Sequence, residues 1–365
     1  MKRIYLSLAI LLTLMMASGC GDDDNEQTGN GDSEAGVPYP DVPDGMTAGN
    51  AASNKNFATL QRRVSSASVS PAPWAGYWWP YSTNGIAGAA AKHDLARGTG
   101  GSQSWEVSNH GQGLAGVADW WGHCNGWAAA ALLMPEPKGP KTINGVEFSI
   151  SDRKALLSEV FMEVTGDFLG NRVNNPGDTS SGAFRDIVPA QFYLMLTNVI
   201  GLQRRAFIMD RFTGVEVWNH PVVAYANSPV RSEDYLGVDP EFPQVHRVNV
   251  TTQIWWVEDN VDPNIVTPAF DPSNLGSAFK SRTLRYELWL DAAPQFDGAG
   301  NLAAAGDVIL ANDAGRAVGG SWKNGALPLV NSYPDYIWIP TGAARSSGHK
   351  NPRIDDAWIR QNLGG

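Results

Sequence analysis

Residues 120–130 read Trp120-Trp121-Gly122-His123-Cys124-Asn125-Gly126-Trp127-Ala128-Ala129-Ala130. The apolar residues from 127 to 134 predict a helix, which the prolines at 135 and 137 terminate. Cys124 therefore lies at a helix N-terminus, where unpaired backbone N–H groups and the helix dipole favour the thiolate form. A lone thiol in that setting, in a chain that also has histidines, is a candidate nucleophile.

The alternative for Cys124 is a buried structural thiol, because free cysteines are among the most buried residue types. Gly122 and Gly126 bracket the position, and tryptophans stand on both sides of it. These neighbours favour the nucleophile, so an enzyme is the leading hypothesis.

The N-terminus predicts export. Lys2 and Arg3 precede an apolar run from Ile4 to Met16, which is too short for a stable membrane helix. Ala-Ser-Gly before Cys20 resembles a lipobox, so we expect residues 1–19 to be a lipoprotein signal peptide and Cys20 to be lipidated. The alternative is an ordinary signal peptide cut near Ala17.

The segment that follows is built like a tether. Residues 21–36 read GDDDNEQTGNGDSEAG, which offers too little apolar surface to fold, so residues 20–45 are predicted to be disordered. Residue 21 is not Asp, so the inner-membrane retention signal of Gram-negative lipoproteins is missing. We expect an exported lipoprotein of the outer membrane or cell surface of a Gram-negative bacterium. If Cys20 is lipidated, Cys124 carries the only unpaired thiol of the mature chain.

Charge and size limit the function classes. The net charge of −10 becomes −12 when the leader with Lys2 and Arg3 is removed, and no Lys/Arg cluster stands out. We therefore expect no nucleic-acid partner. The rest of the chain is long enough for one large domain, which we place at residues 46–345, followed by a polar C-terminal tail at 346–365.

Patterns of apolar residues predict an α+β fold. Helical spacing is found at 152–164 and at 189–200, where Gly201 follows as a helix stop. Strands rich in Val, Trp, Ile and Thr are predicted at 215–226, 248–258, 283–291 and 336–340, with a turn at 297–301. An N-terminal helical part that carries the cysteine, followed by a C-terminal antiparallel sheet, is the layout of papain-like thiol enzymes.

Such an enzyme needs a base near the sulfur and a third group that orients the base. Of the six histidines, His220 starts an apolar strand downstream of Cys124, the position of the catalytic histidine in papain-like enzymes. The alternative is a polar residue at a strand edge beside Pro221. Glu258 and Asp259, at the polar end of the next predicted strand, are the candidates for the orienting carboxylate, with Glu258 slightly preferred.

The segment VWNHPVVAY at 217–225 resembles the elicitor peptide of oomycete cell-wall transglutaminases, which begins Val-Trp-Asn-Gln-Pro-Val. The run Trp-Gly-x-Cys-x-x-Trp-Ala around Cys124 is similar to the active-site segment of the same family. Further similar stretches follow in one order from about residue 70 to 341: 73–74, 77–80, 142–146, 184–186, 197–198, 319–322 and 334–340.

The resemblance implies a papain-like protein-glutamine γ-glutamyltransferase, in a family whose known members use calcium. Cys124 would form a thioester with a glutamine side chain and pass the acyl group to a lysine amine. The partners would be glutamine- and lysine-bearing proteins and, through the lipid anchor, a membrane; we expect a monomer. His220 departs from the family, which has Gln at this position. Either this branch has a complete catalytic triad with His220 as the base, or the base lies elsewhere.

Trp121, Trp127 and Trp218 are predicted to wall the acyl site and exclude water, although core packing would also explain them. The sequence identifies no residues as metal ligands. Two rival classes remain: a papain-like peptidase or deamidase with the same nucleophile, and a non-catalytic lipoprotein that binds surfaces through its tryptophans. Rapid alkylation of Cys124 near neutral pH would favour an enzyme over the binder.

Overall fold

The computed structural model describes residues 54–170, 187–211, 216–310, 320–322, 334–344 and 348–365. The predictions for the leader, Cys20 and the tether, and the similar stretches at 184–186 and Gly319, lie outside these residues. No helix among the described residues is long and apolar enough to cross a membrane.

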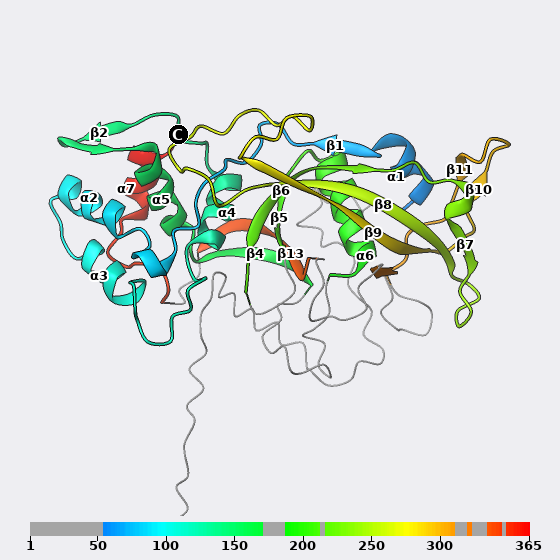
Figure 1. The fold of residues 1–365 in the computed structure, drawn as a ribbon, viewed down its shortest axis with the longest axis horizontal. Coiled ribbons are helices and arrows are strands. Elements are labelled where there is room, and N and C mark those ends of the chain that lie inside the picture. Colours follow the sequence, from blue (N-terminus) through cyan, green and yellow to red (C-terminus); the bar gives the residue numbers. More distant parts are fainter. Residues whose placement is uncertain (1–53, 171–186, 212–215, 311–319, 323–333, 345–347) are drawn as a thin grey trace, which may run out of the picture.

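Figure 1 shows a cluster of helices at one end of the molecule and a long sheet that extends away from it. The helices are α1 (Phe57–Arg63), α2 (Ala87–Arg97), α3 (Ser102–Asn109), α4 (Cys124–Leu133), α5 (Ile150–Val160), α6 (Pro189–Leu194) and α7 (Asp356–Leu363), with a π-helix at Met195–Leu202. The α+β fold predicted from the sequence is confirmed.

The main sheet has nine antiparallel strands in the order β12-β9-β8-β6-β5-β13-β4, with β1 also paired to β6 and β7 to β8. Its strands are β1 (Ser66–Ser68), β4 (Val164–Gly170), β5 (Phe207–Asp210), β6 (Asn219–Asn227), β7 (Tyr235–Val238), β8 (His246–Val257), β9 (Phe279–Leu290), β12 (Ser321–Trp322) and β13 (Tyr336–Ala344). Two small hairpins pair β2 (Lys141–Ile143) with β3 (Val146–Phe148) and β10 (Gln295–Phe296) with β11 (Leu302–Ala304). The sheet therefore draws β1 and β4 from the N-terminal half of the chain.

Alternation along the strands divides the interior into two cores. Phe207 and Met209 lie in the core that includes α1, α6 and the π-helix, whereas Ile208 between them lies in the core that includes α4 and α5. Because successive strand residues point to opposite faces, one apolar strand supplies both cores. The molecule thus has a helical layer on each face of the sheet, and α4 is packed on one of them.

α4 and α5 form where propensity and capping predict. α4 contains four consecutive alanines, is almost completely buried, and ends at Leu133, with Met134 as its C-cap before Pro135. α5 starts earlier than predicted, because Ser149 caps it and forms a reciprocal capping box with Asp152.

The helix predicted at 189–200 is only partly α-helical. It has Pro189 in its first turn as expected, but it changes to a π-helix at Met195 and continues past Gly201 to Leu202. The Thr197 hydroxyl and the Asn198 amide donate to the carbonyls of Tyr193 and Leu194, in competition with the backbone ladder. Gly201 is required for space rather than as a stop, since a Cβ there would lie 2.6 Å from the Tyr225 hydroxyl.

The structure corrects the prediction of a polar tail at 346–365. Its last part forms α7, which lies beside α5 in Figure 1 and buries Ile359 and Leu363. Arg153 on α5 donates to the carbonyls of Leu363 and Gly364, at 3.0 and 2.7 Å. The sequence of α7 is polar on one face only, so its mean composition concealed the apolar stripe that docks it.

Candidate active site

Cys124 is the first residue of α4, and its side chain is completely buried. Its Sγ lies 3.7 Å from the carbonyl oxygen of Val217 and 3.9 Å from Nδ2 of Asn219, just before and at the start of β6. The helix N-terminus predicted for Cys124 is therefore confirmed.

Cys124 is disulfide-bonded, and none of the described residues is a free cysteine. This corrects the expectation that Cys124 carries an unpaired thiol. A chain with two cysteines can form one disulfide, and Cys20, the other cysteine, lies outside the described residues.

Close backbone contacts fix the end of α4 that carries the sulfur. The His123 N–H donates to the Trp78 carbonyl at 2.6 Å, and a Cβ on Gly122 would lie 2.4 Å from that same oxygen. On the next turn, a Cβ on Gly126 would lie 2.2 Å from the Ser158 carbonyl of α5. The two glycines that flank Cys124 thus allow α4 to approach its neighbours closely, which is a packing role.

Asn219 is the polar side chain that faces the sulfur, and the sequence prediction missed it. Its Oδ1 accepts from the indole N–H of Trp338 at 2.8 Å and faces the Tyr336 hydroxyl at 3.5 Å. These donors orient the amide so that its NH₂ group points toward Cys124. The shared Val-Trp-Asn of the elicitor peptide was the signal in the sequence that could have identified this residue.

His220 is fully buried and has partners of its own. Its Nδ1 bonds the Val257 carbonyl at 2.9 Å, which leaves Nε2 as the lone-pair nitrogen, 3.9 Å from Oδ1 of Asp259. Burial, together with the charge of Arg211, lowers the pKa of His220 to about 4. The imidazole is therefore neutral at physiological pH.

His220 and Cys124 are not joined by a hydrogen bond among the described residues. Neighbouring residues of a strand point to opposite faces, so Asn219 meets the sulfur while His220 turns toward Val257 and Asp259. Edge-on contacts with the rings of Trp127 and Trp256, at 6.2 and 6.4 Å between centroids, complete the surroundings of the imidazole.

The structure brings both predicted carboxylates to His220. One ligand atom each from His220, Glu258 and Asp259 lies within 4.8 Å of the others, so the group could hold a cation. Burial raises the pKa of Asp259 well above its usual range, and the neighbouring charge of Glu258 adds to the effect. Asp259 is buried, whereas Glu258 is the half-buried member of the pair.

Of the three tryptophans predicted to wall the site, Trp218 is the one at the surface. It is half-buried and packs edge-on against Trp78, with 5.4 Å between ring centroids. Trp121 and Trp127 are buried. The Trp127 ring occupies the space above Gly76, where a Cβ would lie 2.4 Å from its Nε1.

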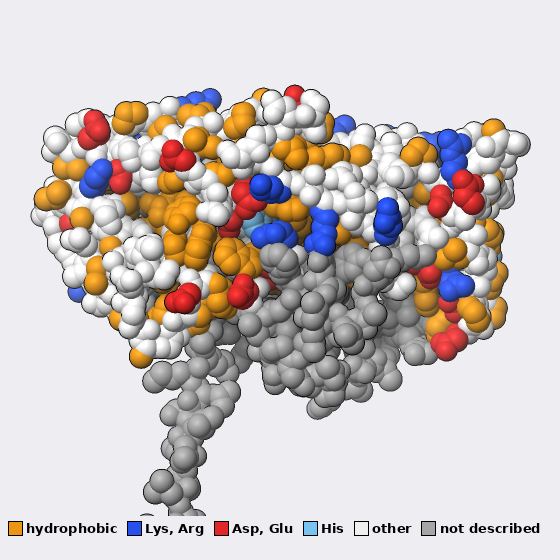
Figure 2. All heavy atoms as spheres, in the orientation of Figure 1, with side chains coloured by type: hydrophobic (Ala, Val, Ile, Leu, Met, Phe, Trp, Pro, Cys, Tyr) orange, Lys and Arg blue, Asp and Glu red, His pale blue; other side chains and the backbone are white. Residues whose placement is uncertain are grey.

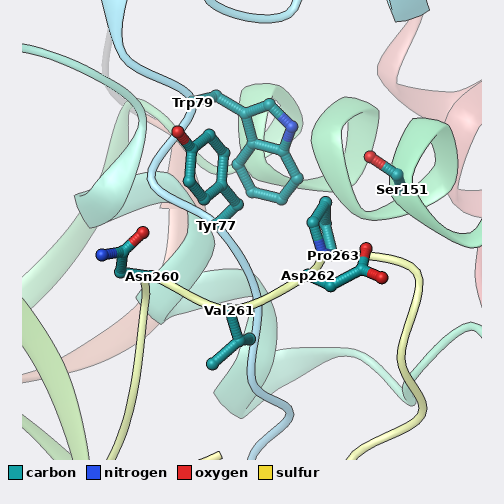
Figure 3. Close-up of a pocket in the computed structure, with 7 residues that line it drawn as sticks. All are labelled: Tyr77, Trp79, Ser151, Asn260, Val261, Asp262 and Pro263. Atoms are coloured by element: carbon teal, nitrogen blue, oxygen red, sulfur yellow. The ribbon is translucent and has the colours of Figure 1, made fainter. Parts of the chain in front are cut away.

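A surface hollow of about 480 Å³ adjoins the site. Figure 3 shows the rings of Tyr77 and Trp79 on one side and the segment Asn260–Pro263 on the other, with Ser151 of α5 nearby. Asn260 follows Asp259 directly and forms a bridge to Tyr77, so the hollow is continuous in sequence with both Trp78 and the carboxylate group.

Comparison with known proteins supports the resemblance seen in the sequence. The sequence profile of the transglutaminase elicitor family matches residues 88–236, a segment that contains Cys124, Asn219 and His220. No protein of curated function matches the sequence significantly.

The fold is similar to the crystal structure of the GP42 transglutaminase from Phytophthora sojae, with a TM-score of 0.62. The match covers 89% of this chain and 98% of that chain, at 20% sequence identity, which is a level that supports the fold alone. Together, the profile match over residues 88–236 and the shared fold confirm that this chain resembles the transglutaminase elicitor family.

Proposed function

We propose that this protein is a thiol-dependent acyltransferase of the transglutaminase type, with Cys124 as its nucleophile. The observation that carries the proposal is the sulfur at the N-terminus of α4, facing an amide that is oriented by Trp338. The profile match to the transglutaminase elicitor family supports the same assignment.

The reaction has an activation step and two acyl-transfer steps. An external thiol first reduces the disulfide of Cys124 and leaves its thiolate. The base takes up the proton that the external thiol releases in this exchange. The thiolate attacks the side-chain carboxamide carbon of a glutamine, ammonia leaves with that proton, and a thioester remains. A lysine amine then attacks the thioester carbon, loses a proton, and expels the thiolate, so that an isopeptide bond replaces the carboxamide.

Asn219 is the side-chain donor for this chemistry. In each acyl-transfer step negative charge develops on the former carbonyl oxygen, next to the sulfur that Asn219 Nδ2 faces at 3.9 Å. The backbone N–H of Cys124, at the start of the helix, is the second donor. Because Trp338 holds the amide in place, little reorganisation is needed when the charge appears.

His220 is proposed as the base, through Nε2. Val257 holds Nδ1, and burial keeps the imidazole neutral and able to accept a proton. The nearby Glu258 and Asp259 would stabilise the imidazolium that forms.

The surface around the site suits a protein substrate. Trp78 and Trp218 form a half-buried aromatic pair close to Val217 and Cys124. Figure 2 shows hydrophobic side chains gathered on one face of the molecule, between the helical end and the sheet, with Lys and Arg side chains nearby. Glutamine- and lysine-bearing proteins are therefore the proposed substrates. Calcium is proposed as a requirement by family resemblance. A lipid on Cys20 would be attached through its sulfur, so a membrane anchor for the monomer is proposed only for chains in which Cys20 is not disulfide-bonded.

The test is incorporation of a fluorescent primary amine into casein by the full-length chain, with and without reductant and with and without calcium. We expect labelling that depends on reductant and is absent from Cys124→Ala. Casein fragments, or ammonia release without amine incorporation, would instead assign a peptidase or a deamidase. A folded, reduced protein with none of these activities would contradict the proposal and favour a surface binder.

A further inference from the structure

A second group of buried ionisable side chains lies one residue away from Cys124, and the proposed reaction does not use it. The group contains Glu106 on α3, His110 at the C-cap of α3, His123 at the N-cap of α4, and Glu159 on α5. Glu106, His123 and Glu159 are 0% exposed and His110 is 4% exposed. Four groups that can each carry charge are thus removed from water together, which is costly unless something balances them.

One atom of each side chain points to a common centre. Oε2 of Glu106 lies 3.1 Å from His110 Nδ1 and 3.8 Å from His123 Nε2, and His123 Nε2 lies 2.9 Å from Oε2 of Glu159. All four atoms lie within 4.8 Å of one another. For bonds of about 2.0–2.1 Å to a tetrahedral zinc ion, ligand atoms are separated by about 3.3 Å. The three distances lie on both sides of that value.

A direct hydrogen bond does not explain the closest pair. His123 Nε2 and Glu159 Oε2 are fully buried and 2.9 Å apart, yet neither has a partner with hydrogen-bond geometry among the described residues. The two atoms thus form an ion-pair contact without hydrogen-bond geometry, and a shared cation would satisfy both. Atoms that share a metal ion are arranged in this way.

Hydrogen bonds and ring stacking from residues outside the cluster orient its four side chains. His123 Nδ1 bonds the Trp79 carbonyl at 3.2 Å, so Nε2 keeps the lone pair that points inward. Asn351 donates through Nδ2 to Oε1 of Glu106 at 2.8 Å and through its backbone N–H to Oε1 of Glu159, which leaves both Oε2 atoms toward the centre. Tyr81 stacks on His110 with ring centroids 4.2 Å apart. Metal ligands in proteins are typically supported by such second contacts.

The total charge of the four side chains also favours a bound cation. Two ionised carboxylates and two neutral imidazoles carry a total of −2, which a divalent cation would neutralise.

We propose that Glu106, His110, His123 and Glu159 form a site for one divalent transition-metal ion of the zinc type. Two imidazole nitrogens favour zinc over calcium or magnesium, which prefer oxygen ligands in larger number. Four protein ligands would close the coordination sphere, as in structural zinc sites. The ion would connect α3, the N-terminus of α4 and α5, and would thereby fix the helix end from which Cys124 projects.

The test uses the metal content and thermal stability of the full-length chain, so it is independent of any enzymatic activity. We expect about one equivalent of zinc to remain after gel filtration in metal-free buffer. Removal by a chelator should lower the Tm by several degrees, and Zn²⁺ but not Ca²⁺ should restore it. Co²⁺ in place of zinc should give the intense visible bands of a tetrahedral site.

Glu159→Gln keeps the shape of the side chain but removes the charge, and it should bind less than a tenth of the wild-type zinc. His246→Gln is the matched control, because His246 is partly exposed and bonds Tyr235, away from the cluster. The proposal is overturned if Zn²⁺ leaves the Tm of the chelator-treated protein unchanged, or if Glu159→Gln binds zinc like the wild type. If Glu159→Gln does not fold, the Co²⁺ spectrum decides: weak octahedral bands in the wild type would overturn the site.

Discussion

At the residue scale, the surroundings of Cys124 are decided by two neighbouring residues of β6 that face different partners. Asn219 meets the sulfur and His220 meets Val257 and Asp259. The sequence analysis selected the histidine because of its chemistry, whereas strand alternation directs the asparagine to the sulfur. Because they face different partners, Asn219 and His220 can be tested separately.

The oxyanion role of Asn219 is tested with Asn219→Asp. The carboxylate can still accept from Trp338, but it no longer donates a hydrogen bond to the oxygen on which negative charge develops. We expect kcat for amine incorporation to fall about 100-fold or more, with little change in KM, as for loss of an oxyanion donor. A variant with normal kcat and an unchanged Tm would exclude Asn219 from the chemistry.

The role of His220 as a base is tested with His220→Gln beside His220→Ala. Glutamine is the residue of the oomycete elicitor peptide at this position, so it is a natural substitute that cannot act as a base. If Nε2 takes the proton, both variants should lose at least about 100-fold in kcat. Full activity of His220→Gln together with a weak His220→Ala would show that the side chain only supports the fold.

His220 also predicts how stability depends on pH. Its pKa in the folded chain, about 4, lies below the usual 6.5, so the unfolded chain binds more protons between these values. The stabilising contribution is present above pH 6.5 and is lost as the pH falls toward 4. At pH 4.5 this amounts to a loss of about 2–3 kcal/mol relative to pH 7.5. Urea unfolding at both pH values should show that extra loss in the wild type and not in His220→Gln; equal losses would contradict the assignment.

At the scale of elements, the crossing of α4 and α5 holds the sulfur in place. Gly126 lies directly against the Ser158 carbonyl, and Asn125 donates to the Met162 carbonyl at 3.0 Å. The alanine-rich sequence of α4 favours a helix wherever it lies, but the close approach requires glycine at this one turn.

Substitution of two helical glycines tests that crossing. Gly126→Ala places a Cβ 2.2 Å from the Ser158 carbonyl, so α4 and α5 must separate. We expect a loss of about 2 kcal/mol or more in the free energy of unfolding. Gly88→Ala on α2 is the control: a Cβ there meets nothing within 4 Å, and higher helix propensity should stabilise the protein by about 0.5–1 kcal/mol. Equal effects of the two substitutions would show that the helices can move apart easily.

At the scale of the whole molecule, the C-terminal segment completes the helical layer. Arg153 of α5 donates to the Gly139, Leu363 and Gly364 carbonyls, and Ile359 is completely buried. Asn351, which precedes α7, also bonds both carboxylates of the proposed metal site. The end of the chain thus contacts the same helices that support Cys124.

Ile359→Ala tests whether α7 is part of the cooperative fold. Removing a fully buried isoleucine side chain should lower the free energy of unfolding by about 2–5 kcal/mol in urea titration. Gln361→Ala, on the exposed side of the same helix, should change it by less than about 0.5 kcal/mol. If Ile359→Ala leaves stability unchanged, α7 is attached too weakly to serve the site.

By itself, the sequence determined the elements whose signals are local. Apolar periodicity predicted α5 and the long strands, Pro135 ended α4, and the position of Cys124 at a helix N-terminus followed from those signals. The family resemblance also rested on contiguous residues, 217–225 and the run around Cys124, and the profile match confirmed it.

Only the tertiary structure decided which side chains meet. Asn219 and Cys124 are 95 residues apart, and Glu106 and Asn351 are 245 apart, so no local pattern pairs them. The sequence does not show that the apolar stripe of α7 packs against α5. It also does not show that the Trp127 ring lies against Gly76 in the core. Local propensity specifies a helix or a strand, but contacts between distant residues depend on the face that each element buries, which is a property of the packed chain.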